Sequence, residues 1–235
     1  MYKEQIAKNT YSFYFDRTAN PTYAFSAGQY TKVFLDAPKD PIGTWRMFTT
    51  CSSPRQIDRL MITTKVDNNS GIFKQKMAGL QKGDKVKFSG PLGGFSLPKK
   101  STSPLILLAG GIGITPFHSM LLHAAAINFS SPITFIVSFS TVEEMIFYDE
   151  LSRLSKDHPN IKVVYTISRP EQSHNKWDGE TGRISEQLIK KYASSILTST
   201  YFIAGSSMMV SSMLDLLEVM GIPDDQVREE QLTGY

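Results

Sequence analysis

The spacing of hydrophobic residues changes close to residue 98. Before that point, short stretches that are rich in aromatic and β-branched residues are separated by turn-forming residues. Several short strands at this spacing predict an antiparallel β-barrel or a sandwich. The expected strands are residues 10–17, 23–25, 31–35, 47–50, 60–66 and 85–88, with one helix at 72–80.

Beyond a polar linker at residues 99–104, short apolar runs alternate with stretches of helical periodicity. The expected strands are 105–109, 133–139, 161–167 and 201–204, and the expected helices are 116–127, 143–155, 184–193 and 207–219. Strands that alternate with helices in this way predict an α/β doubly wound parallel sheet. We therefore expect a two-domain protein, with an antiparallel β-barrel in residues 1–100 and the α/β domain in residues 101–235.

The most informative part of the second half is the stretch 105–122. Its apolar opening, residues 105–108, has the composition of a strand that is buried on both faces of a parallel sheet. Gly110, Gly111 and Gly113 follow this strand. Because glycine accepts positive φ and has no side chain, the backbone there can turn tightly and come close to a ligand. Glycines in such a turn can also serve only the close packing of a helix on a strand.

The helix after these glycines is expected to have Thr115 as its N-cap and Pro116 as its first residue. A helix N-terminus exposes amide hydrogens and a partial positive charge, which favour an anionic phosphate group. We therefore interpret the stretch as a dinucleotide-binding turn. It matches neither the G-x-G-x-x-G fingerprint nor a P-loop.

The composition limits the class of protein. Hydrophobic residues make up 41% and charged residues 20% of the chain, as in ordinary globular proteins. A single cysteine, Cys51, excludes a disulfide framework or a cysteine-ligated iron–sulfur cluster within the chain. We expect this cysteine to be a buried structural thiol rather than a reactive one. A reducing compartment fits this cysteine usage, and the start of the chain lacks the pattern of a secretion signal, so the expected location is cytoplasmic.

A long segment without charged residues, 101–142, must be compared with a membrane span. Glycines, prolines and serines interrupt it, so no apolar run reaches the roughly 18 to 20 residues that a span needs. We interpret the segment as two buried strands and a helix. His118 and His123 within it are five positions apart and do not share a helical face, so no metal site is expected there.

Five ordered motifs resemble those of the ferredoxin-NADP reductase family. Residues 46–52, Arg-Met-Phe-Thr-Thr-Cys-Ser, resemble its flavin-binding motif Arg-x-Tyr-Ser/Thr, and residues 71–74 stand where the family has a second, phosphate-facing flavin turn. Residues 90–93 match its Gly-Pro-x-Gly, and residues 110–116 match its Gly-Gly-x-Gly-x-Thr-Pro. The closing residues 230–235 resemble its Glu-x-Phe-x-Gly-Tyr. This context favours ligand binding over packing alone as the role of the glycine turn.

The resemblance implies an FAD-binding barrel followed by an NAD(P)-binding α/β domain, with the flavin in the cleft between them. Arg46 would pair with the flavin diphosphate, because a guanidinium matches phosphate oxygens. Phe48 would lie against the isoalloxazine, and Thr49 would offer a hydroxyl or an amide to the N5 edge of the flavin. Residues 71–74 would present backbone amides to the diphosphate.

By the same resemblance, Gly111, Gly113 and Thr115 would hold the nicotinamide dinucleotide, with Gly205 and Ser206 beneath the nicotinamide. The expected catalytic residues are Thr49, Glu230 and Tyr235. The expected cofactor-binding residues are Arg46, Met47, Phe48, Thr49, Thr64, Lys65, Gly71, Ile72, Phe73, Lys74, Gly110, Gly111, Gly113, Thr115, Pro116, Ser168, Arg169, Gly205, Ser206 and Tyr235.

The sequence departs from the family pattern at several of these positions. Phe48 replaces the usual Tyr, so a hydroxyl contact to the ribityl chain is lost while stacking is kept. Lys74 stands where many members have Ser, and Ala204 stands where many have the Cys of a Cys-Gly-x motif. Leu232 replaces Phe in the closing motif, and the terminal Tyr235 either covers the flavin or is a frayed, inert chain end.

The implied function is hydride transfer from NADPH or NADH to FAD, followed by electron transfer to a separate acceptor. A flavin or quinone reductase that acts on small molecules is the alternative enzyme, and a flavin-binding regulatory subunit without turnover is the alternative outside the enzymes. The Ser168–Arg169 pair after a strand suits a 2′-phosphate, whereas Ser140 stands where some members have Arg. We expect NADPH as the donor.

Charge along the chain suggests the kind of acceptor. Residues 65–100 contain eight lysines against two aspartates, a local balance of +6 in a chain of net charge +3, so the remainder sums to −3. A basic barrel can steer an acidic protein such as a ferredoxin or a flavodoxin to the flavin. The alternatives are an ordinary solvated surface and nucleic acid, for which no stacking or groove-binding motif is present.

Overall fold

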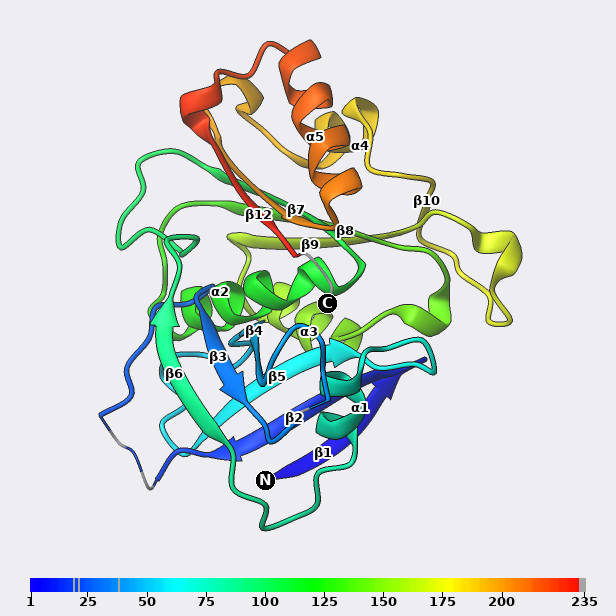
Figure 1. Cartoon of the computed structure of the whole chain (residues 1–235). Coiled ribbons are helices and arrows are strands. Elements are labelled where there is room, and N and C mark those ends of the chain that lie inside the picture. Colours follow the sequence, from blue (N-terminus) through cyan, green and yellow to red (C-terminus); the bar gives the residue numbers. More distant parts are fainter. Residues whose placement is uncertain (19, 21, 38, 233–235) are drawn as a thin grey trace.

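The first half of the chain forms two antiparallel sheets. The computed structural model describes residues 1–18, 20, 22–37 and 39–232 (Figure 1). One sheet has the order β1 (Tyr2–Ala7), β2 (Thr10–Asp16), β5 (Arg59–Lys65), and the other has the order β4 (Trp45–Thr49), β3 (Tyr30–Phe34), β6 (Lys87–Leu92). The helix α1 (Ile72–Ala78) follows β5 and supplies Phe73 and Met77 to the core between the sheets. This arrangement confirms the predicted antiparallel architecture.

Two of the predicted strands in this half were wrong or misplaced, and one strand was missed. Residues 23–25 are not a strand. Arg17 donates to the carbonyl oxygen of Tyr23, and its guanidinium lies 5.4 Å from the ring of Phe25. The Arg17 side chain therefore holds this segment in place of the hydrogen bonds of a neighbouring strand. The strand expected at 85–88 runs from Lys87 to Leu92. The missed strand, β1, lies at a sheet edge with most of its side chains exposed, so no apolar pattern marks it.

The second half forms a six-stranded parallel sheet, as predicted. Its order is β10-β9-β8-β7-β11-β12, and every pair is parallel. The strands are β7 (Leu105–Gly110), β8 (Ile133–Phe139), β9 (Ile161–Ile167), β10 (Glu180–Thr181), β11 (Thr200–Gly205) and β12 (Val227–Gln231). Sequence analysis missed β10 and β12, because both are edge strands and one is only two residues long.

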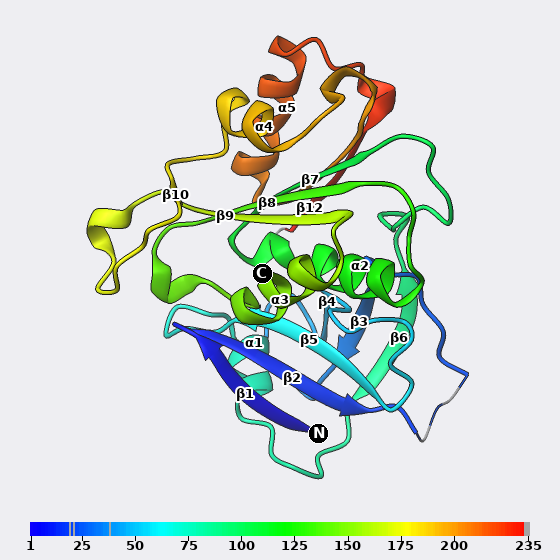
Figure 2. The same ribbon diagram turned by 180° about the vertical axis from the view of Figure 1, so that it is seen from behind.

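Helices cover both faces of this sheet (Figures 1 and 2). The helices α2 (Ile114–Ala126) and α3 (Tyr148–Asp157) lie between the sheet and the barrel, and α4 (Glu186–Tyr192) and α5 (Ser207–Val219) cover the other face. Alternate residues of β7 serve the two faces: Leu105 and Leu107 pack in one cluster, and Ile106 and Leu108 pack in the other. The continuous apolar run of this strand follows from its burial on both sides.

Three of the predicted helix starts differ from the structure. The helix α2 begins at Ile114, after a 3₁₀ turn at Gly111–Gly113, and Thr115 is not its N-cap, because its hydroxyl donates to the carbonyl oxygen of Ile112 at 3.0 Å. The helix expected at 143–155 begins at Tyr148, because Phe147 adopts positive φ. The helix α4 starts two residues later than expected, after the N-cap Ser185.

Helix α2 also joins the two halves of the molecule. His118 Nδ1 lies 2.8 Å from the carbonyl oxygen of Cys51, and Ser119 Oγ donates to the carbonyl oxygen of Ser52 at 2.7 Å. These contacts place the second turn of α2 against Cys51 and Ser52, which follow β4 at the end of the flavin-like motif. The junction between barrel and sheet is therefore hydrogen-bonded as well as packed.

Candidate functional site

Two cavities open where the barrel meets the carboxyl end of β7. The first, which we call the barrel cavity, has a volume of about 170 Å³. Residues of β4, β5 and α1 line it, together with the turn after β7 and the end of β12. Its lining residues are Tyr30, Arg46, Met47, Phe48, Thr49, Thr63, Thr64, Lys74, Ile112, Thr115, Glu230, Gln231 and Leu232.

The second, which we call the sheet cavity, has a volume of about 620 Å³ and follows the carboxyl ends of β7, β8 and β9. Ligands of doubly wound sheets bind at this edge. Its lining residues are Thr64, Lys65, Lys74, Gly110, Gly111, Ile112, Ser138, Phe139, Ser140, Glu144, Ser168, Arg169, Arg183, Ile184, Ser206, Met208, Met209, Ser212, Met213 and Leu232. Thr64, Lys74, Ile112 and Leu232 line both cavities, so the two spaces share a wall.

Gly113 and Gly111 have different roles in the turn after β7. A Cβ on Gly113 would lie 2.1 Å from the carbonyl oxygen of Ala204, so this glycine permits the contact between the turn and β11. Gly111 has φ +53°, and a Cβ there would meet nothing within 4 Å. Because Gly111 borders the sheet cavity, its open side faces the space where a ligand would lie. The packing and the ligand interpretations of this turn thus apply to different glycines.

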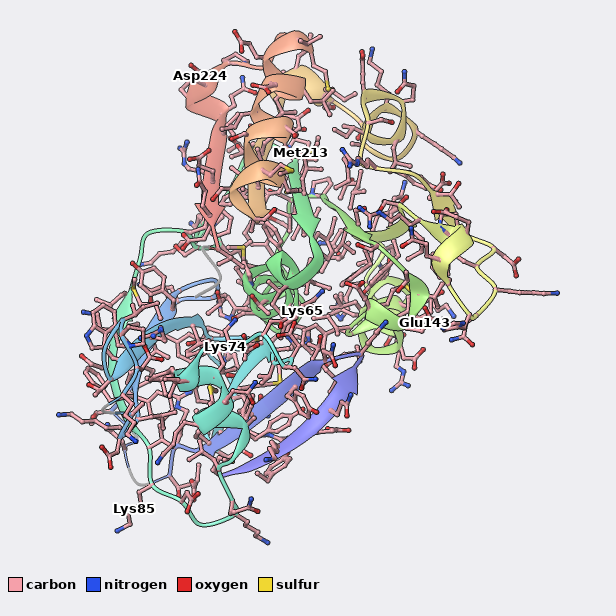
Figure 3. The ribbon with its side chains drawn as sticks, turned by 45° about the vertical axis from the view of Figure 1, so that its right-hand side comes forward. Lys65, Lys74, Lys85, Glu143, Met213 and Asp224 are labelled. Carbon is pink, nitrogen blue, oxygen red and sulfur yellow. The ribbon has the colours of Figure 1, made fainter. Side chains whose placement is uncertain are left out.

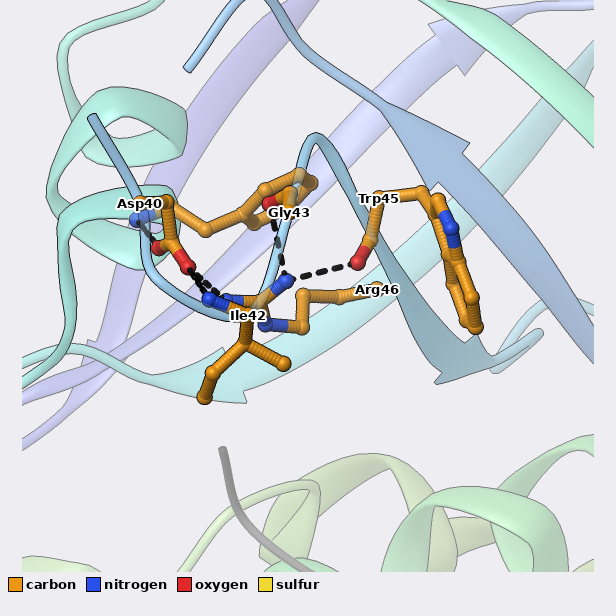
Figure 4. Close-up of polar contacts among 6 residues, drawn as sticks. Asp40, Ile42, Gly43, Trp45 and Arg46 are labelled. Atoms are coloured by element: carbon orange, nitrogen blue, oxygen red, sulfur yellow. Dashed lines mark hydrogen bonds and ion pairs between the residues drawn. The ribbon is translucent and has the colours of Figure 1, made fainter. Parts of the chain in front are cut away.

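Arg46 does not extend into open space but holds its own loop (Figure 4). Its Nη2 donates to Asp40, and its Nη1 donates to the carbonyl oxygens of Gly43 at 3.0 Å and Trp45 at 2.7 Å. The side chains of Arg46 and Asp40 are 5% and 1% exposed. The guanidinium also lies 5.1 Å from the ring of Phe73.

Asp40 connects the loop before β4 to the start of α1. Its Oδ1 accepts from the backbone N–H of Ile42 at 2.9 Å and from Arg46, and its Oδ2 accepts from the N–H of Phe73 at 2.8 Å. Burial opposes ionisation, but the hydrogen bonds from Ile42, Arg46 and Phe73 outweigh it and lower the pKa of Asp40. Sequence analysis did not select Asp40, because no motif includes it.

Two further basic residues lie near the shared wall. Burial lowers the pKa of Lys74, the charge of Arg46 adds to this, and Asp67 opposes it. Lys65 Nζ lies 2.6 Å from Oε2 of Glu144, so this ion pair connects β5 of the barrel to the 3₁₀ turn Val142–Glu144 beside the sheet. In Figure 3, Lys65 and Lys74 lie beside the junction of the two halves.

The predicted catalytic residues lie in different surroundings. Thr49 is buried and lines the barrel cavity together with Glu230. Burial raises the pKa of Glu230, which favours its protonated form. Tyr235 lies outside the described residues. Cys51 is fully buried, which raises the pKa of its thiol to about 12, in agreement with a structural role.

Several predicted binding residues do not border either cavity. Gly71 precedes α1, Ile72 is 45% exposed, and Phe73 is buried against Phe48 with ring centroids 6.1 Å apart. The remaining members of this group are Gly113, Pro116 and Gly205. Among those that do line a cavity, Arg46, Phe48, Thr49 and Thr115 border the barrel cavity. Ser168, Arg169 and Ser206 border the sheet cavity.

Sequence analysis also missed residues at the far end of the sheet cavity. Arg183 follows the short strand β10, which no pattern predicted, and it borders the same cavity as Arg169. Ser138 and Met208 line it as well. Within the described part of the chain, no group of three or more His, Cys, Asp or Glu side chains could hold a metal ion. None of the helices in that part is long and apolar enough to cross a bilayer.

Comparison with known proteins identifies both halves. The family model of the oxidoreductase FAD-binding domain matches residues 1–97, and that of the oxidoreductase NAD-binding domain matches residues 107–215. The chain belongs to the ferredoxin-NADP reductase-like family of FAD- and NAD-binding oxidoreductases. Its cofactors are accordingly FAD and a nicotinamide dinucleotide.

Two relatives show how much of a longer protein the chain covers. It is 27% identical over 231 residues to a flavohemoprotein of Bacillus subtilis, which covers 97% of this chain and 57% of that protein. It is 26% identical over 235 residues to the reductase component of a propane 2-monooxygenase of Gordonia sp., covering 98% and 66%. The chain thus spans about half to two thirds of these relatives.

Solved structures of low identity share the fold. The FAD/NAD-binding domain of a nitric oxide dioxygenase from Vibrio cholerae has a TM-score of 0.84 and 17% identity, covering 98% of this chain and 95% of that one. A ferredoxin NADP⁺ reductase from Neisseria gonorrhoeae has a TM-score of 0.77 and 22% identity, covering 100% and 96%. Both likenesses concern the arrangement of the two halves and not the chemistry of individual residues.

The residues of the two cavities suit a flavin ring and a nicotinamide dinucleotide, but the arginine expected to bind the flavin diphosphate already has a partner. Around the barrel cavity, Phe48 offers an aromatic surface, and Thr49 and Thr64 offer hydroxyl groups, which suit an isoalloxazine ring. Along the sheet cavity, the open side of Gly111 and the basic Arg169 suit a nicotinamide dinucleotide. At the position expected to hold the flavin diphosphate, Arg46 is already paired with Asp40.

Proposed function

We propose that this chain transfers a hydride from NADPH or NADH to FAD and passes the electrons to a separate redox acceptor. The observation that carries the proposal is the wall that the barrel and sheet cavities share, formed by Thr64, Lys74, Ile112 and Leu232. Reacting atoms must approach to about 3–3.5 Å for such a transfer, and two cavities that meet allow this contact. FAD supplies the redox chemistry when bound, and the protein supplies binding, orientation and electrostatics.

Reduction of the bound flavin by the nicotinamide cofactor tests this proposal. The protein, reconstituted with FAD, should lose its flavin absorbance when NADPH or NADH is added without oxygen, and ferricyanide should restore it. A protein that takes up no flavin would exclude both the electron-transfer enzyme and the small-molecule reductase. A protein that binds FAD but is not bleached by either donor would favour a regulatory subunit without turnover.

For the acceptor, we propose an acidic electron-transfer protein such as a ferredoxin or a flavodoxin. The support is the exposed lysines of residues 65–100, of which Lys76 lies on α1, the helix whose Lys74 lines the barrel cavity. Lys85 lies at the opposite end of the barrel in Figure 3, and Lys74 is only partly exposed, so these two contribute less to such a surface. Lys87 begins β6 two residues after Lys85 and lies over the ring of Phe34, so Lys76 is the lysine that we expect to contact the acceptor.

Ionic strength distinguishes this acceptor from a small molecule. If charge steers the encounter, the rate of ferredoxin or flavodoxin reduction should fall steeply between low and physiological salt. Charge reversal at Lys76 should slow reduction of the protein acceptor and leave bleaching by the nicotinamide cofactor unchanged, with charge reversal at Lys85 as the matched control. Unchanged kinetics with the protein acceptor would favour a reductase of free flavins or quinones.

A further inference from the structure

The buried pair of Arg46 and Asp40 stands at the position where the family would place a flavin diphosphate. The guanidinium of Arg46, which would attract a phosphate, already donates from Nη2 to the carboxylate of Asp40. Its Nη1 donates to two backbone carbonyl oxygens. The same carboxylate accepts the N–H of Phe73, an amide of the turn expected to face the phosphates. One aspartate thus occupies two groups that phosphate oxygens would use.

The Arg46–Asp40 pair should attract a phosphate only weakly, because its two charges cancel. A diphosphate is bound well where positive charge is not already compensated, because desolvating the anion is costly. The buried Arg46–Asp40 pair has no net charge, so its attraction for an incoming phosphate is that of a dipole and not of a full cation. The remaining cation on the wall of the barrel cavity is Lys74, whose charged form burial disfavours.

We propose that Asp40 is an internal counter-ion that competes with flavin phosphates for Arg46 and thereby makes the flavin exchangeable. This inference rests on the proposed function, namely on flavin binding in the barrel cavity. Affinity then comes mainly from the isoalloxazine and ribityl parts of the ligand, which contact Phe48 and the threonines of the cavity. Asp40 sets the selectivity among flavins, and FAD, FMN and riboflavin are bound with similar strength and released readily.

Riboflavin provides the reference for the test, because it shares the ring and ribityl chain of FMN but has no phosphate. Dissociation constants of riboflavin, FMN and FAD are measured with flavin-free protein from the change in flavin fluorescence. In the unaltered protein, the ratio of the riboflavin constant to the FMN constant should be below about tenfold. A ratio above that limit, in a protein that NADPH or NADH still bleaches, would overturn this inference while the proposed function stands.

Removal of the carboxylate charge tests the role of Asp40 directly. Asp40→Asn should raise the riboflavin-to-FMN ratio by about tenfold or more, because Arg46 and the amide of Phe73 become accessible to phosphate oxygens. The double variant Asp40→Asn, Arg46→Gln should return the ratio to that of the unaltered protein. Asp36→Asn is the matched control, since this exposed aspartate lies in the same loop and its loss removes the same charge.

Two outcomes in the variants contradict the proposal. If Asp40 instead orients Arg46 for the phosphate, Asp40→Asn lowers the ratio and the double variant lowers it further. If Asp40 is only a structural brace, all three flavins change affinity by the same factor and the ratio stays constant. Asp40→Ser, which removes the charge with a smaller side chain, is measured in parallel. In either variant, a riboflavin dissociation constant within about twofold of that of the unaltered protein shows that the cavity is intact.

Discussion

The imidazole of His118 and the carbonyl oxygen of Cys51 lie 2.8 Å apart, and this contact ties α2 to the end of the flavin-like motif, just after β4. The other ring nitrogen, Nε2, lies 2.8 Å from Glu150 of α3. His118 is 1% exposed and its ring stacks on Phe147 with centroids 3.9 Å apart. One buried side chain therefore links the barrel to two helices of the α/β half.

Replacement of this histidine should loosen the junction. His118→Phe keeps an aromatic ring but removes both nitrogens, so the carbonyl of Cys51 loses its partner, and the free energy of unfolding should fall by about 1–3 kcal/mol. Ser119→Ala, which removes a single bond to the neighbouring carbonyl of Ser52, should cost less, about 0.5–1.5 kcal/mol. Denaturant unfolding measures both values. Equal stability of His118→Phe and the unaltered protein would show that the contact carries no energy.

Glu143 should make the stability of the fold sensitive to acid. The backbone N–H groups of Asn175 and His174 bind its carboxylate and lower its pKa from 4.5 to about 2. A carboxyl group with a lowered pKa stabilises the folded state above the pKa of the unfolded state, and this contribution is lost as the pH falls toward the folded value. The denaturation midpoint should therefore drop between about pH 4.5 and about pH 2.

The variant Glu143→Gln isolates this contribution. It should be less stable than the unaltered protein at neutral pH, and its stability should decline less steeply over the same acid range, because the titrating group is gone. Denaturation midpoints measured across the pH range for both proteins give the comparison. Parallel curves would mean that other carboxylates account for the acid sensitivity.

The two glycines at the turn after β7 should respond differently to alanine. Gly113→Ala places a Cβ against the backbone oxygen of Ala204, which cannot move aside, so we expect a loss of about 1–3 kcal/mol or more in stability. Gly111→Ala meets no neighbour but must keep positive φ, at a cost of about 1–2 kcal/mol. The Kd of NADPH or NADH, measured on folded protein, should rise strongly in Gly111→Ala and only slightly in Gly113→Ala.

Glu230 should affect the chemical step more than binding. Its side chain lines the barrel cavity, and burial raises the pKa of its carboxyl group. Glu230→Gln preserves the shape of the side chain but removes its ionisable carboxyl group, so the rate of flavin reduction should fall by about tenfold or more, while the Kd of FAD stays within about twofold. Stopped-flow reduction and flavin titration separate the two quantities. A change in FAD affinity alone would assign Glu230 to binding.

Arg169 and Arg183 should determine the preference for NADPH. Both line the sheet cavity, in which Ser140 and Ser168 provide hydroxyl groups, and guanidinium groups bind a 2′-phosphate well. Arg169→Ala and Arg183→Ala should each lower kcat/KM for NADPH by about tenfold and leave kcat/KM for NADH nearly unchanged. A large preference of the unaltered protein for NADH would overturn this assignment.

The sequence alone determined the change from antiparallel strands to alternating strands and helices, and the glycine turn after β7. Aromatic and β-branched residues mark strands such as β2, because these side chains pack well on a half-buried pleated surface. A continuous apolar run marks β7, because both faces of that strand are buried. The glycines at 110, 111 and 113 were evident for the same local reason, since backbone conformation and close approach restrict residue type at the position itself.

Only the tertiary structure decided the remainder. The pairing of Asp40 with Arg46 and with Phe73, 33 positions away, depends on how the loop before β4 folds over α1. Arg183 reaches the sheet cavity from the end of β10, an edge strand of two residues that carries no apolar signal. Local patterns record burial, whereas the partners of a charged side chain are set by contacts between segments far apart in the chain.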